Sequence, residues 1–192
     1  MKKRLCCFIL AFILIAICQA GCGKKDNGMK KVVLNEVAHS IFYAPQYVAI
    51  EMGYFKDAGI DLVLETGFGA DKTMTALISG NADIGFMGSE STIYAYAEGS
   101  KDYAVNFAGL TQRAGNFLVA REKIDNFSWD MVKGKNVLGG RKGGMPQMVL
   151  EYILKANNID PASDLSIDQS VDFGLTAGAF SGNTEYDFTV EF

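Results

Sequence analysis

The sequence predicts an α/β fold with two lobes, each built on a doubly wound sheet. Two observations predict this fold. Runs rich in Val, Leu and Ile alternate with helical segments of about ten residues, a pattern typical of parallel sheets. The pattern is interrupted near residues 111–115 and then begins again, which indicates a hinge and a second lobe. We therefore expect a first lobe over residues 31–113 and a second lobe over residues 114–192.

The first lobe is expected to hold three strands and three helices. The strands are expected at residues 31–37, 61–66 and 82–88, where β-branched and other apolar residues gather. The helices are expected at residues 44–55, 71–80 and 90–99, and Gly99 would cap the last of them. Since a helix follows each strand, the three strands are expected to be parallel.

Two strand-like runs are expected on either side of the hinge, at residues 103–111 and 115–122, and a new alternation of strands and helices follows them in the second lobe. A further strand is expected at residues 135–140, followed by a Gly-rich turn and a helix at residues 146–159. Pro146 would occupy the first turn of that helix, where the missing N–H does no harm. The turn, RKGGM, is not a phosphate-binding P-loop, because it lacks the spacing that ends in Gly-Lys-Ser/Thr.

Three loops are expected at the carboxyl ends of the first three strands, where doubly wound sheets bind ligands. They read HSIFYAP, GFGAD and GSES. Each combines small or hydroxyl residues with a following helix, so that backbone N–H groups and the positive helix end point into one crevice. Taken singly, each loop fits ordinary helix capping equally well. Three such loops on one edge favour a binding crevice.

The N-terminus is typical of a secretory signal peptide. Basic residues at positions 2–4 precede an apolar run at residues 5–17, and small residues follow at 20 and 21. The run is shorter than the ~20 residues that a bilayer-spanning helix needs. We therefore expect residues 1–21 to be removed on export, and residues 22–30 to form a polar tether.

All four cysteines, Cys6, Cys7, Cys18 and Cys22, fall in the first 22 residues. The tetrapeptide QAGC ending at Cys22 resembles the lipobox of bacterial lipoproteins, although Gln19 stands where Leu is usual. The resemblance implies that Cys22 is lipidated, and two acyl chains suffice for stable anchoring. The alternative is cleavage near Ala20 that leaves Cys22 as a free thiol. In either case disulfides and thiolate metal sites are excluded from the mature chain.

Charge argues against nucleic acid as a partner. Removal of residues 1–21 takes away three basic residues and no acidic one, which leaves 15 basic and 22 acidic residues and a net charge of −7. A protein that binds nucleic acid needs a basic face.

Several runs together resemble the periplasmic-type solute-binding proteins of ABC importers. They are HSIFYAPQYVAIEMGYFKDAGIDLVL, ALISGNADIGFMGSE, GLTQRAGNFLVAR and GGRKGGMPQ. More narrowly, they are similar to the branch that binds nitrate, sulfonates, taurine and thiamine-pyrimidine precursors, over residues 31–192. The resemblance implies a two-lobe, periplasmic-binding-protein-like clamp that closes on its ligand through a hinge. It also implies an ABC permease and ATPase as partners, anchoring outside the cytoplasmic membrane, and no cofactor, metal or catalytic residue.

The resemblance places ligand contacts on the three loops, the crossover and the Gly-rich turn. The residues are His39, Ser40, Phe42, Tyr43, Gly67, Phe68, Gly88, Ser89, Glu90, Gln112, Arg113, Arg141, Gly143, Gly144 and Met145. We expect Phe42 and Tyr43 to line the cleft and not to belong mainly to the core.

The chemistry of the ligand stays open between two classes. The aromatic rings of Phe42, Tyr43 and Phe68 suit a flat ring. Arg113, Arg141 and Lys142 suit an anion, and each fits solvated surface equally well. In the turn RKGGM, the N–H groups of the two glycines either receive a ligand oxyanion or merely permit a tight turn.

Two other functions compete with solute capture. The same fold hosts fungal pyrimidine synthases, which bind pyridoxal phosphate through a lysine and consume a histidine. His39 is the only histidine, and the nearest lysine is Lys31, at the start of the preceding strand. A lone histidine is more often a packing or hydrogen-bonding residue, and a signal peptide favours export. An extracellular sensory or adhesive lobe is the other alternative.

The sequence stops at DFTVEF, within a strand-like alternation. Chains of the family continue, cross the hinge again and complete both lobes. We therefore expect this chain to be a fragment whose second lobe is incomplete. The preceding NTEYDF is a further candidate for ligand contacts.

Overall fold

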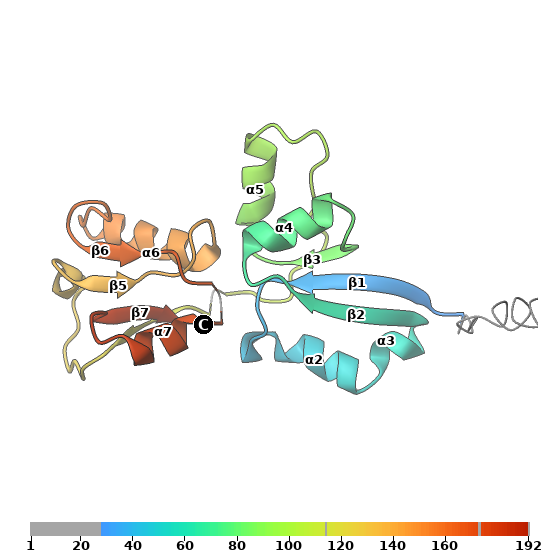
Figure 1. The fold of residues 1–192 in the computed structure, drawn as a ribbon, viewed down its shortest axis with the longest axis horizontal. Helices are drawn as coiled ribbons and strands as arrows, with labels where there is room; N and C mark the ends of the chain where they lie inside the picture. Colours follow the sequence, from blue (N-terminus) through green and yellow to red (C-terminus); the bar gives the residue numbers. More distant parts are fainter. Residues whose placement is uncertain (1–27, 114, 173, 192) are drawn as a thin grey trace, which may run out of the picture.

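The computed structural model describes residues 28–113, 115–172 and 174–191. Two α/β lobes lie side by side along the long axis, each with its own sheet (Figure 1). The prediction of a two-lobe α/β fold is confirmed. The predicted signal peptide and Cys22 lie outside the described residues. Among the residues that are described, no helix is long and apolar enough to cross a membrane.

The sheet of the first lobe has the strand order β2-β1-β3 and is parallel throughout. Its strands are β1 (Lys30–Glu36), β2 (Ile60–Thr66) and β3 (Ile84–Phe86). The central strand β1 pairs on both sides, which is why even its polar residues Asn35 and Glu36 are buried. Parallel strands covered on both faces are expected to be apolar, so these two polar residues require hydrogen-bonding partners.

Helices cover both faces of this sheet. The helices α2 (Ala44–Glu51) and α3 (Tyr54–Asp57) lie on one side, and α4 (Ala70–Ile78) and α5 (Glu90–Ala97) lie on the other (Figure 1). The single helix predicted at residues 44–55 is wrong. The chain turns at Gly53, whose φ of 79° lies in the left-handed region that glycine adopts easily.

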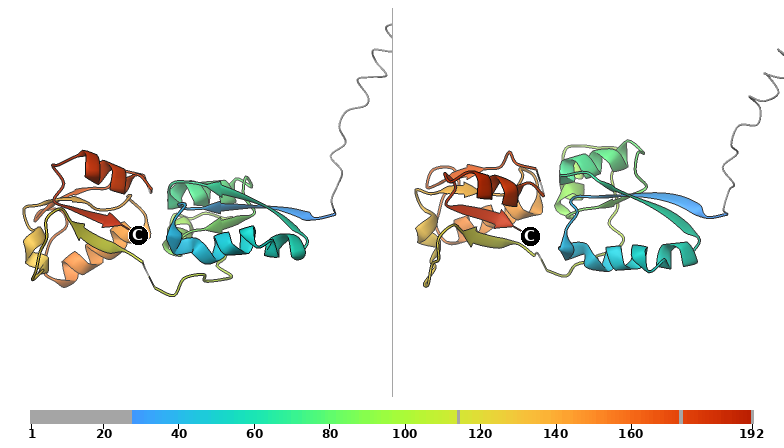
Figure 2. Two further views of the ribbon diagram at one scale, coloured as in Figure 1. Left: turned by 90° about the horizontal axis from the view of Figure 1, so that it is seen from below. Right: turned by 60° about the horizontal axis from the view of Figure 1, so that its bottom comes forward.

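The second lobe contains a mixed sheet with the order β4-β7-β5-β6. Its strands are β4 (Phe117–Ala120), β5 (Asn136–Leu138), β6 (Ser166–Asp168) and β7 (Phe188–Glu191). The strand β7 is parallel to β5 but antiparallel to β4, which makes this sheet mixed. The helices α6 (Met145–Ala156) and α7 (Thr176–Gly182) lie on opposite sides of this sheet (Figure 2).

The core of the second lobe is formed by buried apolar side chains from the strands, from α6 and from the segments that flank them. They are Val132, Val137, Leu150, Leu154, Ile159, Leu165, Phe188 and Val190.

The segment NTEYDF, at residues 183–188, lies in the second lobe and leads into β7. Arg121 donates hydrogen bonds to the backbone oxygens of Phe180, Asn183 and Tyr186 at 2.6–2.8 Å, and these bonds fix the backbone that precedes β7. None of the residues 183–188 lines the cavity described below.

Residues 103–111, predicted as a strand, form no ladder in the described structure. The run leaves the first lobe and leads toward β4 as an extended connection (Figure 2). Val105 and Phe107 are 75% and 79% exposed. Their strand propensity is not realised, because β-propensity depends on packing against neighbouring strands.

Candidate functional site

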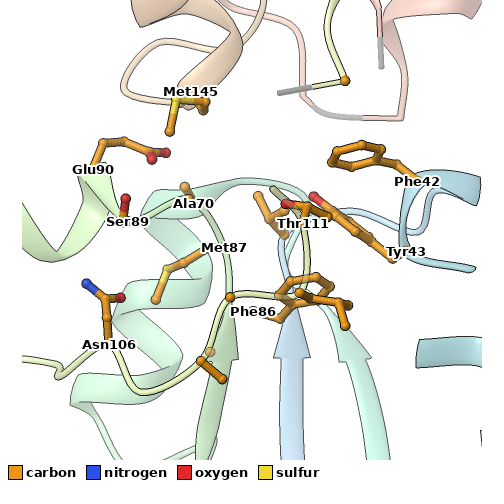
Figure 3. A pocket seen from close by; sticks show the side chains of 18 of the residues that line it. Phe42, Tyr43, Ala70, Phe86, Met87, Ser89, Glu90, Asn106, Thr111 and Met145 are labelled. Atoms are coloured by element: carbon orange, nitrogen blue, oxygen red, sulfur yellow. The ribbon is translucent and has the colours of Figure 1, made fainter. Parts of the chain in front are cut away.

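A cavity of about 440 Å³ lies at the carboxyl ends of β1 and β3 and is lined from both lobes (Figure 3). Its volume falls within the range of roughly 300–1,000 Å³ that is typical of small-molecule sites. Nine of the predicted contact residues line it. They are Phe42, Tyr43, Gly88, Ser89, Glu90, Gln112, Arg113, Gly144 and Met145.

The other six predicted residues, His39, Ser40, Gly67, Phe68, Arg141 and Gly143, do not line this cavity. Conversely, sequence reasoning missed residues 105–111, which form much of one wall. It also missed Phe86 and Met87 at the end of β3. The available signal was position: residues 105–111 directly precede the predicted contacts Gln112 and Arg113, and an extended crossover has to pass the mouth of a cleft between lobes.

Aromatic rings form one wall of the cavity. The ring centroids of Tyr43 and Phe86 are 4.4 Å apart, and those of Phe42 and Tyr43 are 5.6 Å apart. Gly115 lies so close to the Phe42 ring that an added Cβ would be 2.5 Å from its Cε2. Together these contacts hold the rings at the cavity without any help from a ligand.

Tyr43 corrects one expectation. Its side chain lines the cavity but is only 8% exposed, and it belongs to a buried cluster with Val37, Ala38 and Ala70. It is thus both a wall and a core residue. Burial, reinforced by the negative charges of Glu36 and Glu90, raises the pKa of Tyr43 to about 12, so the phenol is neutral at physiological pH.

Glu36 holds the first loop in place through its hydrogen bonds. Its carboxylate is fully buried at the end of β1 and accepts hydrogen bonds from the Gln46 amide and the Tyr47 hydroxyl, both at 2.9 Å. The Thr66 hydroxyl donates a third at 3.2 Å, and His39 Nδ1 lies 2.9 Å from Oε1. These partners satisfy a group whose burial would otherwise be costly.

This network explains why two predicted contacts lie outside the cavity. The His39 ring is drawn to Glu36 and lies against Tyr47, with their ring centroids 4.4 Å apart. Ser40 accepts a hydrogen bond from the backbone N–H of Phe42 and starts a short 3₁₀ turn at Ile41–Tyr43. Both residues shape the loop that presents Phe42 and Tyr43.

The second loop also has a structural role. An added Cβ at Gly67 would lie 2.6 Å from Thr73 Oγ1 and 2.7 Å from Asn35 Oδ1, so close packing requires glycine there. Phe68 has a φ of 59°, and its side chain is 47% exposed outside the cavity. Of this loop, only Ala70 reaches the cavity lining.

Arg141 bridges the two lobes. Its Nη2 and Nε lie 2.8 and 3.0 Å from the two carboxylate oxygens of Asp71 in the first lobe, and its Nη1 contacts Asp172 in the second. Lys72 of the first lobe also contacts Asp172, at 3.0 Å. The hydrogen bonds from Arg141 lower the pKa of Asp71. The guanidinium therefore forms a clasp between the lobes, and it is not part of the cavity lining.

The backbone N–H groups of both glycines in the turn RKGGM already form hydrogen bonds within the protein. The backbone N–H of Gly143 donates to Gln147 Oε1 at 2.8 Å, and that of Gly144 donates to the backbone oxygen of Arg141 at 3.1 Å. Both donors that the oxyanion interpretation required are thus engaged. The structure favours the tight-turn interpretation. The φ of 84° at Gly143 also supports it, because glycine adopts this left-handed conformation easily.

We predict that Arg141→Ala loosens the clasp. The change leaves Asp71 and Asp172 facing each other without their shared cation, and the pair is only partly buried, so we expect a loss of about 1–2 kcal/mol in unfolding free energy. Small-angle scattering at low salt should report a larger radius of gyration. Lys123→Ala is the control, because it removes an exposed ion pair that stays within the second lobe. An unchanged radius would contradict the clasp.

Glu90 is a buried carboxyl group in the cavity wall. It opens α5, is 3% exposed, and lines the cavity beside Ser89. Among the described residues, its Oε2 has no hydrogen-bond partner. Burial raises the pKa of the carboxyl, and the backbone N–H groups of Glu90 and Met145 act in the opposite direction. Gly88 makes room for this carboxylate, since an added Cβ there would collide with it.

The other charged lining residue, Arg113, has an exposed side chain on the crossover. Across residues 28–113, 115–172 and 174–191, no group of three or more His, Cys, Asp or Glu side chains is placed to hold a metal ion. The cavity therefore combines a buried carboxylate, an aromatic wall and a more exposed guanidinium.

Comparison with known proteins gives a consistent result. The family described as NMT1/THI5 like matches residues 41–179. YtlA of Bacillus subtilis (strain 168), which is named for a binding role, is 52% identical over 176 residues. That match covers 91% of this chain and 52% of YtlA, so the chain spans about half the length of this relative.

Solved structures resemble the fold at low identity. The alkanesulfonate-binding protein SsuA from Xanthomonas axonopodis pv. citri, bound to MOPS, has a TM-score of 0.58 at 13% identity. A protein of Bordetella bronchiseptica RB50 has a TM-score of 0.56 at 20% identity. The two matches cover 86% and 85% of this chain, and 54% and 51% of those chains. Identities this low concern the fold alone.

Proposed function

Because the chain belongs to the NMT1/THI5-like family, we propose that it is the solute-binding component of an ABC importer. In this role it captures a small solute between its lobes and delivers it to a membrane permease driven by an ATPase. The observation that carries the proposal is the cavity of about 440 Å³, which is walled by loops of the first lobe and by Gly144 and Met145 of the second. A ligand there would touch both lobes, and binding would favour their closure.

The solute that we propose is small and heteroaromatic or anionic, of the pyrimidine-precursor, sulfonate or nitrate type. The rings of Phe42, Tyr43 and Phe86 support a flat ligand, since offset stacking adds to the burial of apolar surface. Arg113 supports an anionic group near the crossover.

The competing functions have less support. A pyridoxal-phosphate enzyme would need a lysine at the cofactor, and the part of the cavity lining that the structure describes includes neither a lysine nor His39. A sensory lobe would use the same cleft, and it differs from an importer component only in what receives the closed form.

A ligand screen tests solute capture. The full chain is heated with sulfonates, nitrate, pyrimidines and flavins, and at least one class should raise its melting temperature. In Thr111→Trp the added ring fills part of the cavity, so the shift should disappear. Tyr152→Trp is the control, because Tyr152 is 72% exposed on α6 and does not line the cavity. The absence of any shift across the four classes would count against the proposal.

We further propose export and lipid anchoring at Cys22, supported by the residues that precede it. We expect cells that express the chain to incorporate a palmitate analogue into it, and Cys22→Ser to abolish the label and release the protein from the membrane fraction. Cys18→Ser is the matched control, since Cys18 precedes the expected cleavage and its loss should change neither result. A wild-type chain without label would overturn this proposal.

A further inference from the structure

We propose that Glu90 selects solutes that present an N–H donor to it, such as an amino-substituted ring or an amidinium, over solutes whose polar group is only an oxyanion. The inference rests on the proposed function and names the solute class that the same cavity takes. It narrows the choice between heteroaromatic and anionic solutes, which the family and the fold leave open.

The first step is the unmet demand of the carboxylate. Glu90 is only 3% exposed, yet its Oε2 accepts no hydrogen bond among the described residues. A buried acceptor without a donor is costly, and natural proteins rarely leave one in place. A donor supplied by the ligand would satisfy this group.

The second step is that nearby cations are committed elsewhere. Arg141 is held by Asp71 and Asp172, and Lys72 is held by Asp172. Arg113 lines the cavity from the crossover, where its side chain is exposed, and no contact joins it to Glu90 in the described structure. The ionised form of the Glu90 carboxyl thus has no cationic side chain beside it, and this form would repel a sulfonate, nitrate or carboxylate placed against it.

The third step is the placement of Glu90 relative to the rings. In Figure 3, Glu90 and Met145 lie on one side of the pocket, and Phe42 and Tyr43 lie on the other. A flat ring that packs on the aromatic side can extend a substituent toward Glu90. An N–H substituent would form a charge-assisted hydrogen bond there, and these are stronger than neutral ones. The geometry thus favours a ring with a donor at one end.

Matched probes test this selection in the full chain. The pairs are benzamidine and benzoate, 4-aminopyrimidine and pyrimidine-4-carboxylate, and ethylammonium and ethanesulfonate. In each pair that binds, calorimetry should give the higher affinity for the donor probe. In Glu90→Gln that affinity should fall about tenfold to hundredfold, as expected for a lost hydrogen bond to a charged group. The oxyanion probe should bind equally well or better, because its repulsion is removed.

Glu98→Gln is the matched control. Glu98 ends the same helix, is exposed, and does not line the cavity, so the same charge change there should alter no affinity. Preference of the wild type for the oxyanion member of a pair would overturn the inference while leaving solute capture intact. An unchanged donor affinity in Glu90→Gln would do the same. If neither these probes nor the broader solute screen binds, the proposed function itself fails.

A measurement without ligand separates a binding role from a structural one. If Glu90 is kept for a ligand, Glu90→Gln should raise the melting temperature of the empty protein at pH 7, because it replaces a buried carboxylate whose Oε2 has no donor with a neutral amide. Glu98→Gln should leave the melting temperature unchanged. A lower melting temperature in Glu90→Gln would show that the carboxylate stabilises the fold and would overturn the inference.

Discussion

Glu36→Ala is expected to lower the free energy of unfolding by about 3–5 kcal/mol, the largest effect of any single change considered for this protein. The carboxylate is fully buried and is contacted by the side chains of His39, Gln46, Tyr47 and Thr66. Its removal leaves buried donors without an acceptor and opens a void at the end of the central strand. For a domain of ordinary stability, about 5–15 kcal/mol, this is a large fraction of the total.

Urea unfolding followed by circular dichroism measures this loss. Glu65→Ala is the control, because Glu65 lies on the neighbouring strand β2 with an exposed side chain and should change stability by less than about 0.5 kcal/mol. Glu36→Gln keeps the volume and one acceptor oxygen, and should fall between the two. A loss below about 1 kcal/mol in Glu36→Ala would mean that the network does not support the first loop.

Tyr43→Ala is expected to lower the free energy of unfolding by about 2–4 kcal/mol even without ligand. The ring is buried against Val37 and Ala70 and contacts the Phe86 ring, so its loss leaves a cavity in a small core. The same change removes part of the aromatic wall. The affinity for a ring probe such as benzamidine should therefore fall together with stability.

Tyr43→Phe separates these two contributions. It keeps the ring and its packing, so stability should stay within about 1 kcal/mol of the wild type, and any larger change in affinity is then due to the hydroxyl. Tyr152→Ala is the control for removal of an exposed aromatic ring, since Tyr152 is 72% exposed. Full stability of Tyr43→Ala in urea would return Tyr43 to the role first expected for it, a cleft residue outside the core.

The contrast between Tyr43 and Arg141 shows how far the candidate site could be predicted. Position after a strand end predicted that Phe42, Tyr43, Ser89 and Glu90 would lie together, and all four line one cavity, because the carboxyl ends of parallel strands meet at one edge. Residue type alone suggested Arg141 as a partner for an anion. In the structure its guanidinium is bound to Asp71, which is 70 residues away in the chain.

The sequence by itself determined the local elements and their order. Apolar periodicity placed β1, β2 and the helices α4, α5 and α6 within a few residues, since side-chain spacing along a strand or helix is a local property. Only the tertiary structure decided whether a strand-like segment found neighbouring strands with which to form a sheet. Residues 103–111 had the composition of a strand and found no ladder, whereas β7 became the shared neighbour of β4 and β5. The partners of Glu36 and the burial of Glu90 were settled in the same way, because hydrogen bonds and desolvation depend on groups brought together from distant parts of the chain.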